Sequence, residues 1–110
     1  MVFPTFYHNE CFPLVLLEAM QCGVACISTD EAAVPEIIYD ARTGYRVPKE
    51  SDGKPSAARL AEAIEKLIVA PERCRLMGME GRKKYKKEYT LEVFENRITQ
   101  YISNCLRTRT

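Results

Sequence analysis

The sequence predicts an α/β fold: a parallel sheet with flanking helices in the first half of the chain and helices alone in the second. Three observations lead to this class. An apolar segment framed by Pro13 and Gly23 has the residues that favour a helix start and a helix stop. A continuous apolar run, Val24 to Ser28, follows at once, as expected of a parallel strand buried on both faces. From Ser56 onward, apolar residues recur at helical spacing instead.

Composition narrows the class of protein. The 110 residues suit one small domain with one core, and 46% hydrophobic with 28% charged residues is ordinary for a soluble domain. A net charge of +1 argues against a nucleic-acid partner. Five cysteines without a C-x2-C pair, together with a single histidine, argue against a zinc site and favour free thiols in a reducing cytoplasm.

The first elements are a short strand within Met1–Phe6, ending near Pro4, and a helix of about ten residues after Pro13. The helix has almost no polar face, so we expect it to pack on several sides. Glu18 is the exception. Burying an ionised carboxylate without partners costs several kcal/mol, so Glu18 either reaches solvent at a cleft or accepts hydrogen bonds.

The start of this helix suits a phosphate group. Its first turn leaves N–H groups unpaired and carries a partial positive charge. Glu10 lies just before that turn, and Glu18 lies roughly 7–8 Å beyond it at the rise of an α-helix. Carboxylates on both sides of a phosphate site could accept hydrogen bonds from ribose and sugar hydroxyls, which suggests a nucleotide-sugar. The alternative is a buried helix packed on the sheet, with Glu18 hydrogen-bonded internally.

The loop from Thr29 to Ala33 follows the strand at its carboxyl end, where open α/β sheets bind ligands. Pro35–Ile38 predicts a single helical turn, in which Glu36 either caps a site or merely favours the positive helix end. Tyr45–Val47 predicts a short edge strand ended by Pro48. The polar segment Lys49–Pro55 is a loop by composition.

Three helices are predicted after that loop. Ser56 is the expected N-cap of the first, whose apolar positions are 57, 60, 61, 64, 67 and 68. The second starts at Pro71 and contains Gly78 and Gly81, each of which costs about 1 kcal/mol relative to Ala unless close packing compensates. Its basic end, 82–87, is a solvated face or a contact for acidic lipid or for a phosphorylated acceptor. Thr90 caps the third helix, whose apolar face is Phe94, Ile98, Tyr101, Ile102 and Cys105.

The two glutamates carry a family resemblance. Glu10 and Glu18, separated by seven residues, resemble the E-x7-E signature of family 4 retaining glycosyltransferases of the GT-B fold, with Phe-Pro after the first Glu and Glu-Ala-Met at the second. Val34-Pro35-Glu36 and Gly44-Tyr-Arg-Val-Pro48 are similar to the next blocks of that family, and the resemblance extends to about Tyr101.

Two positions depart from the family pattern. Cys11 stands where a small Gly or Ser is common, and Ala32-Ala33 stands where a Gly-Gly pair is common. Both changes add side-chain bulk beside backbone that would approach a ligand. We therefore expect these two departures to weaken donor binding.

The resemblance implies a partial Rossmann-like sheet, the second half of a GT-B C-terminal domain. Residues 1–110 would be a fragment of the nucleotide-sugar-binding domain, with 1–48 bearing the site and 56–107 helical. Glu10 would contact the donor sugar at the catalytic position, and Glu18 the ribose. The N–H groups of Phe12 and Leu14 would bind the diphosphate. The implied reaction is hexosyl transfer with retention, without metal or cofactor; the base and the sugar of the donor stay open.

The resemblance also implies partners. Acceptor contacts would lie in an N-terminal GT-B domain or in another subunit, so we expect the 110 residues alone to be inactive and to self-associate through uncovered surface. Two other classes stay open: a nucleotide-sugar-binding module without chemistry, and a subunit-interaction protein. The expected location is the cytoplasm, with peripheral contact to the inner membrane face left open.

Overall fold

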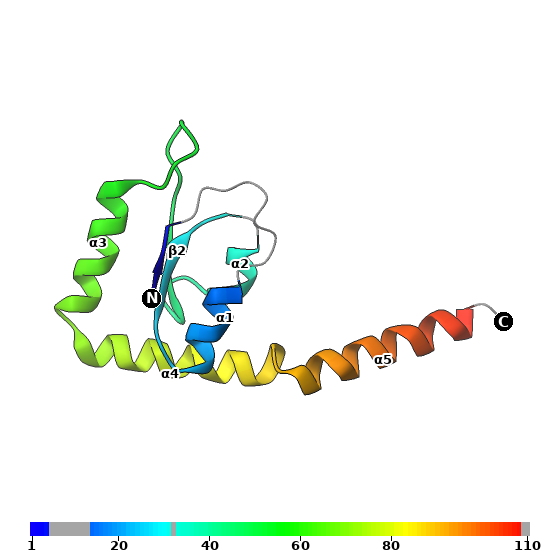
Figure 1. Cartoon of the computed structure of the whole chain (residues 1–110). Coiled ribbons are helices and arrows are strands. Elements are labelled where there is room, and N and C mark those ends of the chain that lie inside the picture. Colours follow the sequence, from blue (N-terminus) through cyan, green and yellow to red (C-terminus); the bar gives the residue numbers. More distant parts are fainter. Residues whose placement is uncertain (5–13, 32, 109–110) are drawn as a thin grey trace.

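A small parallel sheet forms the centre of the computed structural model, which describes residues 1–4, 14–31 and 33–108 (Figure 1). The strands are β1 (Val2–Phe3), β2 (Cys26–Thr29) and β3 (Gly44–Val47), in the order β1-β2-β3. Both pairings are parallel, and Ile27 lies opposite Val2 on one side and Tyr45 on the other. The Ser28 hydroxyl donates to the Phe3 carbonyl at 2.7 Å and joins β2 to β1. The predicted α/β class is confirmed.

Helices cover both faces of this sheet (Figure 1). They are α1 (Leu14–Gln21), α2 (Val34–Ile37), α3 (Ala57–Ile68), α4 (Pro71–Glu88) and α5 (Leu91–Thr108). Each strand residue points to the face opposite its neighbour's, so β2 serves two cores. Cys26 packs with α1 and α2, whereas Ile27 packs with β3, α3 and α4. β2 begins later than predicted, because the Val24 N–H donates to the Ala19 carbonyl at 3.0 Å in the turn that ends α1.

Helix α4 packs closely against the turn between α1 and β2. Gly23 ends α1 with φ of +73°, as its position predicts. A Cβ atom on Gly78 would lie only 1.9 Å from the Gly23 carbonyl oxygen, whereas one on Gly81 would meet nothing nearer than 3.7 Å. The Arg82 guanidinium also donates to the Gln21 carbonyl at 2.9 Å. The close packing expected to compensate for a glycine in α4 is therefore found at Gly78.

The predicted caps of α3 and α5 are confirmed. The Ser56 hydroxyl accepts from the Arg59 N–H at 3.3 Å, and the Thr90 hydroxyl accepts from the Val93 N–H at 3.2 Å. The predicted apolar stripe of α3 is wrong at Ala57, Ala61 and Ile68, which are exposed. Ile68 is 70% exposed, and Ala63 is buried instead. The buried stripe is narrower than the apolar sequence pattern, since Ile68 lies about 100° around the helix from the buried Leu67.

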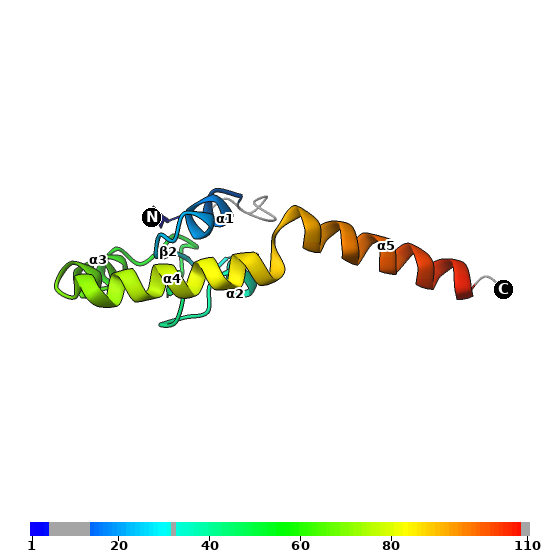
Figure 2. The same cartoon turned by 90° about the horizontal axis from the view of Figure 1, so that it is seen from below.

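Helix α5 extends away from the rest of the molecule (Figures 1 and 2) and contains no buried residue. Its large apolar side chains are exposed and are named here the α5 apolar face: Leu91, Phe94, Ile98, Tyr101, Ile102 and Leu106. Within the described ranges, no helix has both the length and the apolar character needed to cross a membrane.

Candidate functional site

The carboxyl ends of the three strands meet at one edge of the sheet, because all three run in the same direction. Ion pairs join the segments that leave β2 and β3 there. Arg46 Nη1 lies 3.4 Å from Asp30 Oδ1, and Lys49 Nζ lies 2.6 Å from Glu31 Oε2. These contacts fix the start of the connection from β2 to α2 beside the end of β3.

Two of the predicted site residues, Glu10 and Phe12, lie outside the described residues. The other two, Leu14 and Glu18, are one turn apart on α1 and therefore share a face of that helix. Both are exposed, and Leu14 is 65% exposed. Leu16, Ala19 and Met20 are buried, and Val15 and Leu17 are partly buried against the same core, so α1 packs on several sides as expected. The alternative in which Glu18 is a buried carboxylate is wrong.

A groove of about 860 Å³ adjoins the start of α1 and is named here the junction groove, because it lies at the junction of α4 and α5. Leu14 and Leu17 line it from α1, and Glu36 lines it from α2. The remaining lining residues come from the segment after α2 and from the α4–α5 junction: Tyr39, Glu88, Tyr89, Thr90, Leu91, Phe94 and Arg97. The first turn of α1 and the exposed side chain of Glu36 thus face one shared space.

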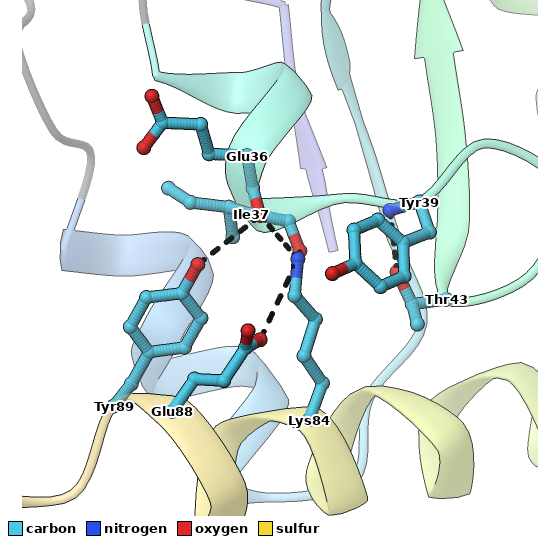
Figure 3. Close-up of polar contacts among 7 residues, drawn as sticks. All are labelled: Glu36, Ile37, Tyr39, Thr43, Lys84, Glu88 and Tyr89. Atoms are coloured by element: carbon cyan, nitrogen blue, oxygen red, sulfur yellow. Dashed lines mark hydrogen bonds and ion pairs between the residues drawn. The ribbon is translucent and has the colours of Figure 1, made fainter. Parts of the chain in front are cut away.

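A polar cluster around Lys84 lies beside the junction groove (Figure 3). Lys84 is only 7% exposed; its ammonium donates to the Glu36 carbonyl and, at 2.8 Å, to the Ile37 carbonyl. The Tyr89 hydroxyl donates to the same Glu36 carbonyl at 3.1 Å. The ammonium also lies 3.6 Å from the centre of the Tyr39 ring, which provides a cation–π contact.

Burial changes the acid–base properties of this cluster. It lowers the pKa of Lys84, an effect that the carboxylates of Glu88 and Glu36 partly oppose. It raises the pKa of Tyr89 to about 12, and the negative charge of Glu88 adds to that effect. Glu88 Oε2 lies 4.0 Å from Lys84 Nζ, so the carboxylate is a distant ion-pair partner of the ammonium.

Sequence reasoning missed Lys84. The basic run 82–87 predicts a solvated face or a lipid contact, and that prediction is wrong for this one lysine, which is buried. The helical spacing contains the missing signal. Lys84 is three residues after Gly81 and seven after Met77, and both of these are buried on the face of α4 that packs inward.

The fold and sequence have clear relatives. The family model of glycosyl transferases group 1 matches residues 1–84. Over 90 residues, the chain is 38% identical to alpha-maltose-1-phosphate synthase of Mycolicibacterium smegmatis, a match that covers 81% of the chain and 23% of that relative. The chain thus spans about a quarter of the length of this relative.

Solved structures agree with the family match. Sucrose-phosphate synthase from Thermosynechococcus elongatus superposes with a TM-score of 0.82 at 27% identity, covering 97% of this chain and 25% of that one. HepE from Anabaena, solved in complex with UDP-glucose, has the same fold, with a TM-score of 0.78 at 16% identity over 94% of this chain and 27% of that one. The parallel sheet and its helices therefore form part of a GT-B fold, and the chain belongs to the glycosyl transferases group 1 family.

Proposed function

We propose that this chain carries the donor-binding part of a glycosyltransferase, and that a nucleotide-sugar binds at the start of α1. The observation that carries the proposal is the position of α1, whose first turn begins after β1 in a parallel sheet while Leu14 and Glu18 stay exposed on one face. Open α/β sheets bind ligands at this edge, and the positive end of a helix favours phosphate. The UDP-glucose bound by HepE supports the same ligand class.

In this proposal, Glu18 accepts hydrogen bonds from the ribose hydroxyls. Glu10 contacts the donor sugar, and the N–H groups of Phe12 and Leu14 bind the diphosphate. During transfer, the bond between the anomeric carbon and the diphosphate breaks, and the electron pair of that bond leaves with the diphosphate. Unpaired N–H groups and the dipole of α1 would stabilise the resulting negative charge. An acceptor hydroxyl gives its proton to the leaving diphosphate and forms the new glycosidic bond with retention at the anomeric carbon. No metal has a part in the proposal.

The chain spans about a quarter of the relatives described above. We therefore propose that the acceptor site comes from an additional N-terminal GT-B domain or from another subunit, and that the 110 residues bind a donor without transferring sugar by themselves. The α5 apolar face supports such a partner, because its six large apolar side chains are exposed and would gain from burial.

Amide NMR titration with UDP, GDP and ADP at millimolar concentration tests the donor site. We expect at least one nucleotide to shift the Leu14 amide and the amides next to it. Glu18→Gln should weaken that binding, whereas Glu92→Gln, on an exposed residue of α5, should leave it unchanged. The proposal fails if all three nucleotides leave the amides of Phe12 and Leu14 unshifted.

A nucleotide-sugar-binding module without chemistry is the second candidate. Cys11 and the Ala32-Ala33 pair favour it, since they add bulk at two positions that commonly carry small residues in the family. A complex with the proposed additional domain or subunit separates the candidates. Turnover of a nucleotide-sugar by that complex supports the transferase, whereas binding without turnover supports the module.

A further inference from the structure

Helix α2 is too short to hold its own position. It has four residues, and its internal bonding amounts to about one turn, closed by the Ile38 N–H donating to the Val34 carbonyl at 2.8 Å. A single turn is unstable in isolation, because the conformational entropy lost in forming the first turn exceeds the stabilisation from its few hydrogen bonds. The last carbonyls of such a turn also need donors from elsewhere. The position of α2 must therefore depend on its tertiary contacts.

Lys84 supplies the donors at the carboxyl end of α2. Its ammonium reaches the carbonyls of both Glu36 and Ile37 from a helix almost fifty residues further along the chain (Figure 3). A positive charge is favourable at the negative end of a helix. The Tyr89 hydroxyl, at the end of α4, binds the Glu36 carbonyl as well. The carboxyl end of α4 thus holds the carboxyl end of α2.

The position of α2 affects the proposed donor site directly. α2 follows the carboxyl end of β2 after a short connection, so a displaced α2 would displace that connection. The Glu36 side chain and Leu14 line the same groove. Any rotation of α2 would therefore move Glu36 relative to the first turn of α1.

We propose that Lys84 is a positioning residue for the nucleotide-sugar site, and that it acts by fixing α2 at the edge of the sheet. This inference rests on the proposed function. Two arguments support a role beyond stability. A buried ammonium is usually no more stabilising than a well-packed apolar side chain. The directional hydrogen bonds of Lys84 fix one orientation of α2, whereas apolar contact alone does not. Lys84 does not contact the donor in this proposal.

The experiment compares Lys84→Met, which keeps an unbranched side chain one atom shorter and removes its charge, with Lys83→Met. Lys83 is adjacent on the same helix and its side chain is 70% exposed, so Lys83→Met is the matched control. UDP affinity is measured by NMR titration at a temperature where circular dichroism shows each variant to be folded. A urea titration gives the folded fraction of each variant.

We expect Lys84→Met to weaken UDP binding about tenfold or more after correction for the folded fraction, and to shift the backbone amide signals of residues 33, 34 and 36–38. Lys83→Met should match the wild-type chain in both measurements. Tyr89→Phe removes one donor from the Glu36 carbonyl and should weaken binding about threefold. It tests the same contact if Lys84→Met does not fold. If Lys84 contributed to stability alone, Lys84→Met would lower the apparent affinity only in proportion to the fraction of chains that are unfolded.

The possible failures are distinguishable. If the wild-type chain binds UDP, and folded Lys84→Met and Tyr89→Phe bind it equally well, Lys84 is not a positioning residue and the proposed function stands. If Lys83→Met weakens binding as much as Lys84→Met, loss of positive charge explains the effect and the inference is wrong. If the wild-type chain binds none of UDP, GDP and ADP, the proposed function fails and the inference fails with it.

Discussion

Replacing Gly78 by Ala tests how closely α4 packs against the turn between α1 and β2. The new Cβ would lie 1.9 Å from the Gly23 carbonyl oxygen and 3.2 Å from the Ala25 nitrogen, whereas ordinary contact begins at 3.4 Å. Since 3.4 − 1.9 = 1.5 Å, the helix or the turn must move by that amount. Both obstacles are backbone atoms, so no side chain can rotate away.

Two opposing terms set the size of the effect. Ala gains about 1 kcal/mol over Gly in a helix interior. Overpacking of a core typically costs about 1–3 kcal/mol, and more where the obstacle is rigid. With overpacking at the upper end of that range and the helix propensity of Ala subtracted, we expect a net loss of about 2 kcal/mol for Gly78→Ala. With a urea slope of about 1–3 kcal/mol per molar, the unfolding midpoint should fall by about 0.7–2 M.

Gly81→Ala is the matched control on the same helix. Its Cβ would meet the Met20 side chain at 3.7 Å, an ordinary contact, so the helix propensity of Ala should dominate. We expect Gly81→Ala to be neutral or to stabilise by up to about 1 kcal/mol. Urea titration followed by circular dichroism measures both variants. A Gly78→Ala chain as stable as the wild type, or equal losses in the two variants, would refute the packing argument.

Three further predictions concern the site, the α5 apolar face and pH. Glu18→Gln should change the free energy of unfolding by less than about 1 kcal/mol, because the side chain is exposed, while UDP binding weakens. The wild-type chain should self-associate through the α5 apolar face in a light-scattering concentration series, and Ile98→Asp should lower the mean mass. Between pH 10 and 12 the wild type should lose more stability than Tyr89→Phe. The native state keeps the Tyr89 proton up to its pKa of about 12, whereas the unfolded state releases it near 10. After allowance for partial exposure, this difference is at most about 2 kcal/mol.

Each of these three predictions would be contradicted by a specific result. A loss of about 3 kcal/mol in Glu18→Gln would mean that the carboxylate has a structural partner. A strictly monomeric mass at high micromolar concentration would show that the α5 apolar face does not drive self-association. Tyr101 is 71% exposed, so Tyr101→Phe is the control for alkaline pH. If the free energy of unfolding depends on pH in the same way in Tyr101→Phe and Tyr89→Phe, burial of Tyr89 does not cause the loss of stability.

Local signals allowed much of the fold to be predicted. Ser56 and Thr90 act as caps because the side chains that bind the first turn lie within three residues of it. Gly23 ends α1 because only its own φ has to become positive. The alternation of helix and buried strand was enough to predict a parallel sheet, since such a strand is apolar on both faces.

Features set by distant parts of the chain could not be predicted in the same way. Lys84 belongs to a run of basic residues, and its burial depends on carbonyls of α2 that lie 47 and 48 positions away. Leu14 is exposed because it lines the junction groove, and no local sequence pattern predicts that groove. Of the candidate site, the sequence predicted the helix that carries Glu18 and left open whether that carboxylate is exposed or internally bonded; the structure has it exposed. The contact that holds α2 was missed.

The burial of Cys26 has a consequence for thiol chemistry. The side chain is completely buried in the central strand, and burial raises the pKa of its thiol to about 11. At pH 8 only about one molecule in a thousand would carry the reactive thiolate there, even if a reagent could reach it. Cys22 and Cys105, by contrast, are exposed free thiols. A variant that keeps Cys26 as its single cysteine would therefore react with an alkylating reagent only when the sheet opens. The rate of its modification would then report how often the whole domain unfolds.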